Sequence, residues 1–337
     1  MSYVDHAGLA TAPGPLVCRD ATLFAFRLQA DAARLESECD RIFAQPTGGA
    51  VRARPLGSHV LLAFARLGQV VPLTAPYDTM GFVQEREAVL FVPVLATARP
   101  GRRMARRRPI PGRFGALSHA EIAGYVAMLL LDNPISIAAG REIYGYPKAC
   151  GWAIFPAAER RDQAEHEIAA ASPASVQPQD FALDAFAFAN SGAASQPGRH
   201  RLLTLTPSGD PAGRRLGGPR DLVRAAHGAG LGQRMAGRVL GLLGPQLPAL
   251  TVRQLFLRQL RAAGGGLGAD FQQVVDAPAT VTRWGEAARL GSYRLQVEDL
   301  ASQKTPADLG ILSGQTASGV RLTFDFEVGP GRSLWGG

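Results

Sequence analysis

One lysine is the residue in this sequence whose type and position could do chemistry. The chain has 36 lysines and arginines, yet only Lys148 and Lys304 are lysine. Lys148 lies in the apolar run IYGYPKACGW, between glycine and proline residues. Arginine keeps its proton in proteins, whereas a buried lysine can lose it and become an amine nucleophile. A compositional bias toward arginine would also leave a few lysines at chance positions, so the surroundings of Lys148 must decide between these interpretations.

The residues before Lys148 predict a short helix that ends just ahead of it. Asn133 is a typical N-cap residue, and Pro134 suits the first helical position. Apolar residues then recur at helical spacing in ISIAAGREI. Gly145 can end the helix in a left-handed conformation, and Pro147 prevents its continuation. Lys148 is therefore expected on a stiff turn directly after a helix.

The run MLLLDNPISIAAGREIYGYPK resembles the active-site segment of the acetoacetate decarboxylase family. The shared residues are the DN, the GRE and the YPK, and weaker similarity covers about residues 16–150 and 250–328. The resemblance places Lys148 at the family's Schiff-base lysine. It implies a lyase that forms an imine with a small keto acid and uses no separate cofactor. Acetoacetate decarboxylase is an established example of a lysine activated by apolar surroundings or by a neighbouring cation.

The same resemblance implies roles for further residues around the lysine. Arg19 matches an arginine on the substrate side, where its guanidinium would hold a carboxylate, although an exposed strand position explains it equally well. Glu85, in GFVQERE, matches a glutamate that faces the lysine and would move protons. Glu87 is the competing carboxylate, because it shares the strand face of Glu85. Tyr144 and Tyr146 would line the pocket and bind substrate, and packing in the core explains them equally well.

Two departures from the family pattern put acetoacetate itself in doubt as the substrate. The family carries a second lysine directly after the catalytic one, where this chain has Ala149. A second family glutamate, expected on the run HVLLAFARLG, is replaced by an apolar residue near Ala65. Two alternatives to a decarboxylase therefore stay open. One is a pyruvate aldolase-dehydratase that uses the same lysine, and the other is a non-catalytic small-molecule binding protein with the same fold.

The predicted fold class is α+β, with a mainly antiparallel, barrel-like sheet and peripheral helices, similar to acetoacetate decarboxylase. Strand-like runs dominate and do not alternate regularly with helices. Helices are expected over residues 31–43 and from about Ser118. With 337 residues, 46% of them hydrophobic and 19% charged, the chain can bury one large core. We predict an irregular segment at 1–15 and a single domain at 16–330, with an insertion at about 191–250.

Charge and composition limit the expected partners. The net charge is +8, and residues 102–108 hold the densest run of arginines, but this run lacks the interleaved aromatic residues of a base-stacking surface. It predicts a solvated loop or a subunit contact. No apolar run reaches the length of a membrane span, and no secretory signal is visible. Three cysteines without a CxxC pair favour a reducing compartment and disfavour a zinc site. We therefore expect a cytoplasmic homo-oligomer without membrane or nucleic-acid partners.

Overall fold

A computed structural model describes residues 11, 13–98, 120–156, 179–188, 197–209, 250–264, 267–303 and 306–336. Three features of the sequence therefore lie outside the described residues. They are the arginine-rich run at 102–108, the run at about 220–243, whose amphipathic spacing predicts a helix, and Lys304. Most of the predicted insertion at 191–250 lies outside them as well.

The described chain is built mainly from strands. These are β1 (Leu16–Gln29), β2 (Val51–Pro55), β3 (His59–Pro72), β4 (Val83–Ala98), β5 (Ala120–Leu131), β6 (Lys148–Ile154), β7 (Phe181–Ala187), β8 (Gly198–Pro207), β9 (Thr251–Arg261), β10 (Ala269–Val297), β11 (Thr316–Val328) and β12 (Arg332–Gly336). The α-helices are α1 (Ala32–Cys39) and α2 (Pro134–Ala139), each continued by a π-helical turn, and short 3-10 helices cover Tyr77–Thr79 and Pro306–Leu309. None of the helices in the described ranges is long and apolar enough to cross a membrane.

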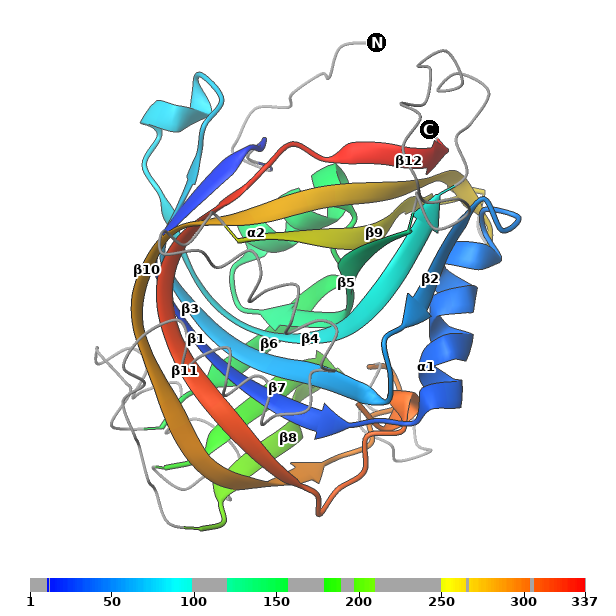
Figure 1. The fold of residues 1–337 in the computed structure, drawn as a ribbon. Coiled ribbons are helices and arrows are strands. Elements are labelled where there is room, and N and C mark those ends of the chain that lie inside the picture. The colour runs from blue at the N-terminus through cyan, green and yellow to red at the C-terminus, as the bar shows by residue number, and fades with distance from the viewer. Residues whose placement is uncertain are drawn as a thin grey trace, which may run out of the picture.

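The strands form one sheet that closes on itself as a ring (Figure 1). One circuit of paired strands runs β4, β3, β1, β11, β10, β9, β5 and back to β4. A second path leads from β10 through β8, β7 and β6 to β5. The pairings are antiparallel except those of β5 with β6 and with β9. The prediction of a mainly antiparallel sheet is therefore confirmed, while the α+β class is confirmed only in part, because the described helices are few and short.

Most predicted elements lie where the sequence pattern put them, but the helix expected from Ser118 is wrong. Residues 120–131 form strand β5, which is hydrogen-bonded to β4 on one side and to β6 and β9 on the other. Its apolar run is buried on both faces, and such a run does not distinguish a helix from a central strand by periodicity. β10 also differs from expectation, since the strand-like runs at 271–284 and 291–300 predict two strands, whereas the chain forms one strand of 29 residues that ends at Val297.

The long strands bury side chains on both of their faces. On one face, side chains of β1, β3, β4 and β5 pack with β6, β7, β8 and α1 in a large core that includes Phe24, Phe64 and Phe181. On the other face, two smaller clusters lie against β10 and β11, one around Tyr144 and Phe256 and one around Cys18. Lys148 and the carboxyl groups near it belong to this second face.

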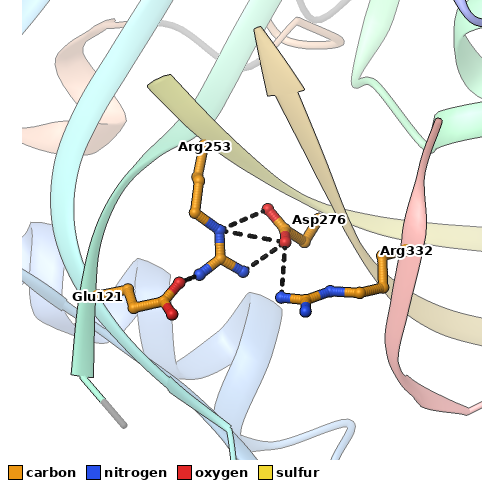
Figure 2. Close-up of polar contacts among 4 residues, drawn as sticks. All are labelled: Glu121, Arg253, Asp276 and Arg332. Atoms are coloured by element: carbon orange, nitrogen blue, oxygen red, sulfur yellow. Dashed lines mark hydrogen bonds and ion pairs between the residues drawn. The ribbon is translucent and has the colours of Figure 1, made fainter. Parts of the chain in front are cut away.

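A network of charged residues joins the strands where the ring closes (Figure 2). Asp276 of β10 is buried and accepts hydrogen bonds from Arg253 of β9, at 3.0 Å to Oδ1 and 3.1 Å to Oδ2 from Nε. Arg332 of β12 donates to the same carboxylate at 3.1 Å. Arg253 also pairs with Glu121 of β5. Two arginines therefore neutralise one buried carboxylate and tie β9 to its neighbours.

Candidate active site

The helix before Lys148 begins and ends at the residues that the sequence predicts. The side chain of Asn133 accepts a hydrogen bond from the backbone N–H of Ser136, and Pro134 is the first helical residue. The helix ends at Gly145, whose φ of +84° is in the left-handed region. Lys148 is the first residue of β6 and pairs with Leu129 of β5. The backbone thus moves from the helix into the interior of the sheet within three residues.

Gly140 lets the lysine side chain lie directly against the helix. A Cβ atom at this position would lie 2.6 Å from Cδ and 2.8 Å from Cε of Lys148, and 3.3 Å from its Nζ. Any side chain there would displace the lysine, so glycine is needed for close approach rather than for conformation. The Nζ atom also lies 5.4 Å from the centre of the Tyr146 ring.

The lysine amine, a carboxylate and a hydroxyl form a buried chain. Nζ of Lys148 lies 3.5 Å from Oε2 of Glu85, and their side chains are 11% and 3% exposed. The hydroxyl of Ser136 donates to the other oxygen of Glu85. The charge of Glu85 is thus compensated by the amine on one side and stabilised by a hydrogen bond on the other. The predicted pair of Lys148 and Glu85 is brought together by α2, β4 and β6.

A second carboxyl, Glu87, lies on the same face of β4. Burial and the negative charge of Glu85 raise the pKa of Glu87 to about 7, and Lys148 acts in the opposite direction. In the described chain, no side chain forms an ion pair with Glu87 or donates a hydrogen bond to it. Its side chain keeps some accessible surface. The site therefore holds two carboxyls and one amine, of which only one carboxyl is paired.

The two tyrosines flank the site, and both hydroxyls have protein partners. Tyr146 donates to Oε1 of Gln254 at 2.8 Å and packs its ring against Phe256, with ring centres 4.0 Å apart. Tyr144 donates to the carbonyl of Gly329 at 3.4 Å. Burial raises the pKa of Tyr144 to about 12, and burial also raises the pKa of Tyr146 well above its usual value. Both phenols thus stay protonated and hold the wall of the site.

No contact among the described residues joins Arg19 to Lys148. Its side chain is exposed, and its positive charge helps to lower the pKa of Asp325, after the larger effect of Arg283. Since successive side chains alternate along a strand, the neighbouring Cys18 points inward instead. The Cys18 thiol is buried, and burial first and then the charges of Glu85 and Glu87 raise its pKa.

The two positions that depart from the family pattern lie in different surroundings. Ala149 packs against the large core, on the face of β6 opposite to Lys148. Ala65 of β3 is buried in the cluster around Cys18, and its cross-strand partner in β4 is Glu87. Directly opposed residues share one face of the sheet. The side chain of Glu87 therefore lies next to the position from which the second carboxylate is missing.

An apolar hollow borders the site on the side of Ser136. Its lining includes Ile135, Ala139, Val70 and Phe82, with Ser136 as a polar member. Ser136 contacts Glu85, and Ala139 precedes the glycine that touches Lys148. The hollow thus lies beside the carboxylate end of the buried chain.

Solved structures of similar fold include acetoacetate decarboxylases. No protein-family model and no curated protein matches the sequence. Acetoacetate decarboxylase from Legionella pneumophila superposes with a TM-score of 0.57 at 14% identity, over 100% of this chain and 93% of that one. This chain has the acetoacetate decarboxylase-like fold.

Two further structures show the range of proteins with this acetoacetate decarboxylase-like fold. An acetoacetate decarboxylase-like enzyme from Sphingomonas wittichii has a TM-score of 0.52 at 14% identity, over 99% of this chain and 98% of that one. The enduracididine biosynthesis enzyme MppR, complexed with pyruvate, has a TM-score of 0.51 at 12% identity, over 96% of this chain and 91% of that one. At these identities the similarity concerns the fold.

Sequence reasoning missed several residues of the site. Ser136, Gly140, Gln254 and Cys18 all contact or border the group around Lys148 and Glu85. Ser136 lies one helical turn before Gly140, so both face the same side of the helical segment. Gln254 has no comparable signal, because its place depends on the parallel pairing of β9 with β5.

Proposed function

We propose that the protein is a Schiff-base-forming lyase that acts on a small keto acid through Lys148. One observation carries the proposal: the amine of Lys148 is held in a buried site beside the carboxylate of Glu85, with Glu87 nearby. An amine that attacks a carbonyl needs a neighbouring group to exchange protons, and carboxyls serve this purpose. The acetoacetate decarboxylase-like fold supports the same chemistry.

Two reactions are compatible with this site. The first is decarboxylation, in which the protonated imine accepts the electron pair of the bond that releases carbon dioxide. The second is aldol condensation of pyruvate followed by dehydration, which uses the same imine. The second is favoured by the neighbour MppR, which has been described in complex with the condensation product of pyruvate and imidazole 4-carboxaldehyde.

The surroundings of the lysine favour a substrate with an apolar substituent. The hollow beside Ser136 is lined mainly by aliphatic and aromatic side chains, which would accept a hydrocarbon group. Arg19 remains the candidate for the substrate carboxylate from the sequence. Arg19→Ala tests this role directly. A larger loss of affinity for keto acids than for neutral ketones, each relative to the wild type, would support it.

The proposed activity is tested by product assays on a panel of keto acids. Carbon dioxide release is measured from acetoacetate and from 3-keto acids with longer alkyl chains. Condensation is measured from pyruvate with aldehydes, through the ultraviolet absorbance of the unsaturated product. We expect turnover of at least one substrate, weak release from acetoacetate, and loss of all turnover in Lys148→Arg. Imine formation without turnover of any substrate would instead support a binding protein.

A further inference from the structure

The hairpin that joins β3 to β4 carries large apolar side chains that the described chain leaves uncovered. Leu73, Met80 and Phe82 are 45%, 60% and 53% exposed. The hairpin is held in place at its start, where the backbone N–H of Leu73 donates to the carbonyl of Pro15 at 2.8 Å. At its end, Gly81 has a φ of +100° and turns the chain into β4. Apolar side chains gathered in this way on a fixed surface segment are typical of a binding site.

Two of these side chains form a wall of the apolar hollow beside the site. Tyr77, Met80, Gly81 and Phe82 line it on the hairpin side, and helix α2 and the adjoining ends of β1, β3 and β4 complete it. The hollow has a volume of about 90 Å³, several times the roughly 10–15 Å³ that one water needs. No charged side chain is among the described residues that line it. A hydrocarbon group of several carbons is therefore the occupant that suits it.

We infer that this hollow binds the alkyl chain on the carbonyl carbon of the keto acid, and that Met80 and Phe82 set the chain length it accepts. The inference rests on the proposed function, because the keto acid must first form an imine with Lys148. The hollow continues directly from that site. Oε2 of Glu85 lies 3.5 Å from Nζ of Lys148, and its other oxygen accepts a hydrogen bond from Ser136, which lines the hollow. A substituent of the imine that passes Glu85 on this side therefore enters the hollow.

Charge decides which branch of the substrate takes this direction. The imine carbon carries one branch with the carboxylate and one alkyl branch. The negative charge of Glu85 repels the carboxylate, and a carboxylate in the hollow would lose its hydration without gaining a positive partner. The alkyl branch instead gains free energy by leaving water, and it also covers Met80 and Phe82. The preferred substrates are therefore keto acids whose alkyl chain is longer than the methyl group of acetoacetate or pyruvate.

A series of 2-oxo acids with straight chains tests the inference without depending on the later steps of the reaction. Pyruvate, 2-oxobutanoate, 2-oxopentanoate and 2-oxohexanoate are trapped with borohydride, and the concentration that gives half-maximal trapping is measured for each. It should fall by about fourfold for each added methylene while the hollow has room, as expected for burial of a methylene group. Equal concentrations for all four acids would overturn the subsite, and a hollow covered by a second copy of the chain would give that result.

Truncation of the hairpin side chains should weaken the preference for long chains. Phe82→Ala and Met80→Ala should each lower the preference for 2-oxohexanoate over pyruvate by about tenfold, and Phe82→Leu should retain most of it. Both side chains are more than half exposed, so their truncation does not disturb the core. Phe186→Ala is the matched control, because Phe186 of β7 is 50% exposed and does not line the hollow. It should leave the preference unchanged.

Oxidation of Met80 by peroxide gives a second measurement that does not depend on affinity. The oxidation of a methionine depends on its exposure. It should slow by about threefold or more in the reduced 2-oxohexanoate adduct relative to the pyruvate adduct. Equal oxidation in both adducts, or an unchanged preference in Phe82→Ala and Met80→Ala, would overturn the subsite and leave the proposed function standing. Absence of trapping of every acid in the wild type would overturn both.

Discussion

Asp276 and Glu87 are both carboxyls inside the same sheet, but positive side chains neutralise the charge of Asp276 fully and that of Glu87 only in part. Asp276 receives hydrogen bonds from two arginines, and one of these arginines also pairs with Glu121 (Figure 2). Glu87 has a like charge as its neighbour on the strand, and the amine within range of its charge is paired with Glu85. Neutralised charge holds strands together, whereas incompletely neutralised charge keeps a proton available near neutral pH.

A third buried carboxylate follows the first pattern. Asp184 of β7 is fully buried and is paired with Arg199 and Arg201 of β8. Both networks use arginine, which cannot give up its proton. The one described lysine is placed instead at the site where a neutral amine would be useful. Within the described residues, arginine thus serves these paired networks, and lysine stands at the proposed reactive position.

The largest loss of stability is expected from breaking the network of Asp276, Arg253 and Arg332. Asp276→Ala leaves Arg253 without its buried partner, and loss of one member of a buried ion pair costs about 3 kcal/mol or more. The cost should lie at the low end, because Arg332 is 58% exposed and can be solvated. Denaturant unfolding measures it. Glu286→Ala, which removes an exposed carboxylate that pairs with the partly buried Arg321, is the control and should change stability by less than about 1 kcal/mol.

Removing the charge of Glu87 should change the free energy of unfolding in the opposite direction, toward higher stability. The pKa of Glu87 is about 7 in the folded chain and 4.5 ordinarily, so between these values the folded chain holds a proton that the unfolded chain releases. The stability that depends on this proton is lost as pH rises from about 4.5 to 7. Glu87→Gln should therefore raise stability at pH 8 by roughly 2 kcal/mol and leave it unchanged at pH 4. An equal effect at both pH values would mean that Glu87 is not held in its protonated form.

A smaller effect is expected from displacing the lysine without changing any charge. Gly140→Ala places a methyl group within 2.6 Å of the lysine side chain and forces it to move. The flexible lysine side chain can move at little cost in stability, but its amine then leaves its place beside Glu85, so imine formation should slow by about tenfold. Gly264→Ala is a suitable control, because a Cβ there meets no atom within 4 Å. Equal rates in both variants would show that the position of Lys148 against Gly140 is not needed.

Local signals in the sequence predicted the turn that carries the lysine. Asn133, Pro134 and Gly145 determine the backbone conformation locally, so the predicted start and end of the helix are confirmed. The face shared by Glu85 and Glu87 also follows from strand alternation. Which of them pairs with Lys148 depends on where β6 lies relative to β4, and only the folded sheet determines that.

Other parts of the fold depend on contacts that no local pattern reveals. β5 was expected to be helical, because its apolar run fits either structure until its neighbours are known. The exposed position of Arg19 follows from the alternation of side chains along β1, in which Cys18 points inward, whereas the resemblance alone does not indicate it. The network of Asp276 joins β9, β10 and β12. Their pairing depends on the folded sheet and not on any local sequence pattern.

Borohydride reduction of the protein with a keto acid tests the central claim most directly. Each keto acid of the panel is incubated with the wild type, Lys148→Arg and Lys304→Arg, and the reduced adduct is measured by intact mass and located by peptide mapping. We predict an adduct of one substrate on the peptide that contains Lys148, in the wild type and in Lys304→Arg, and none in Lys148→Arg. An adduct that persists in Lys148→Arg, or that maps to Lys304, would contradict the account.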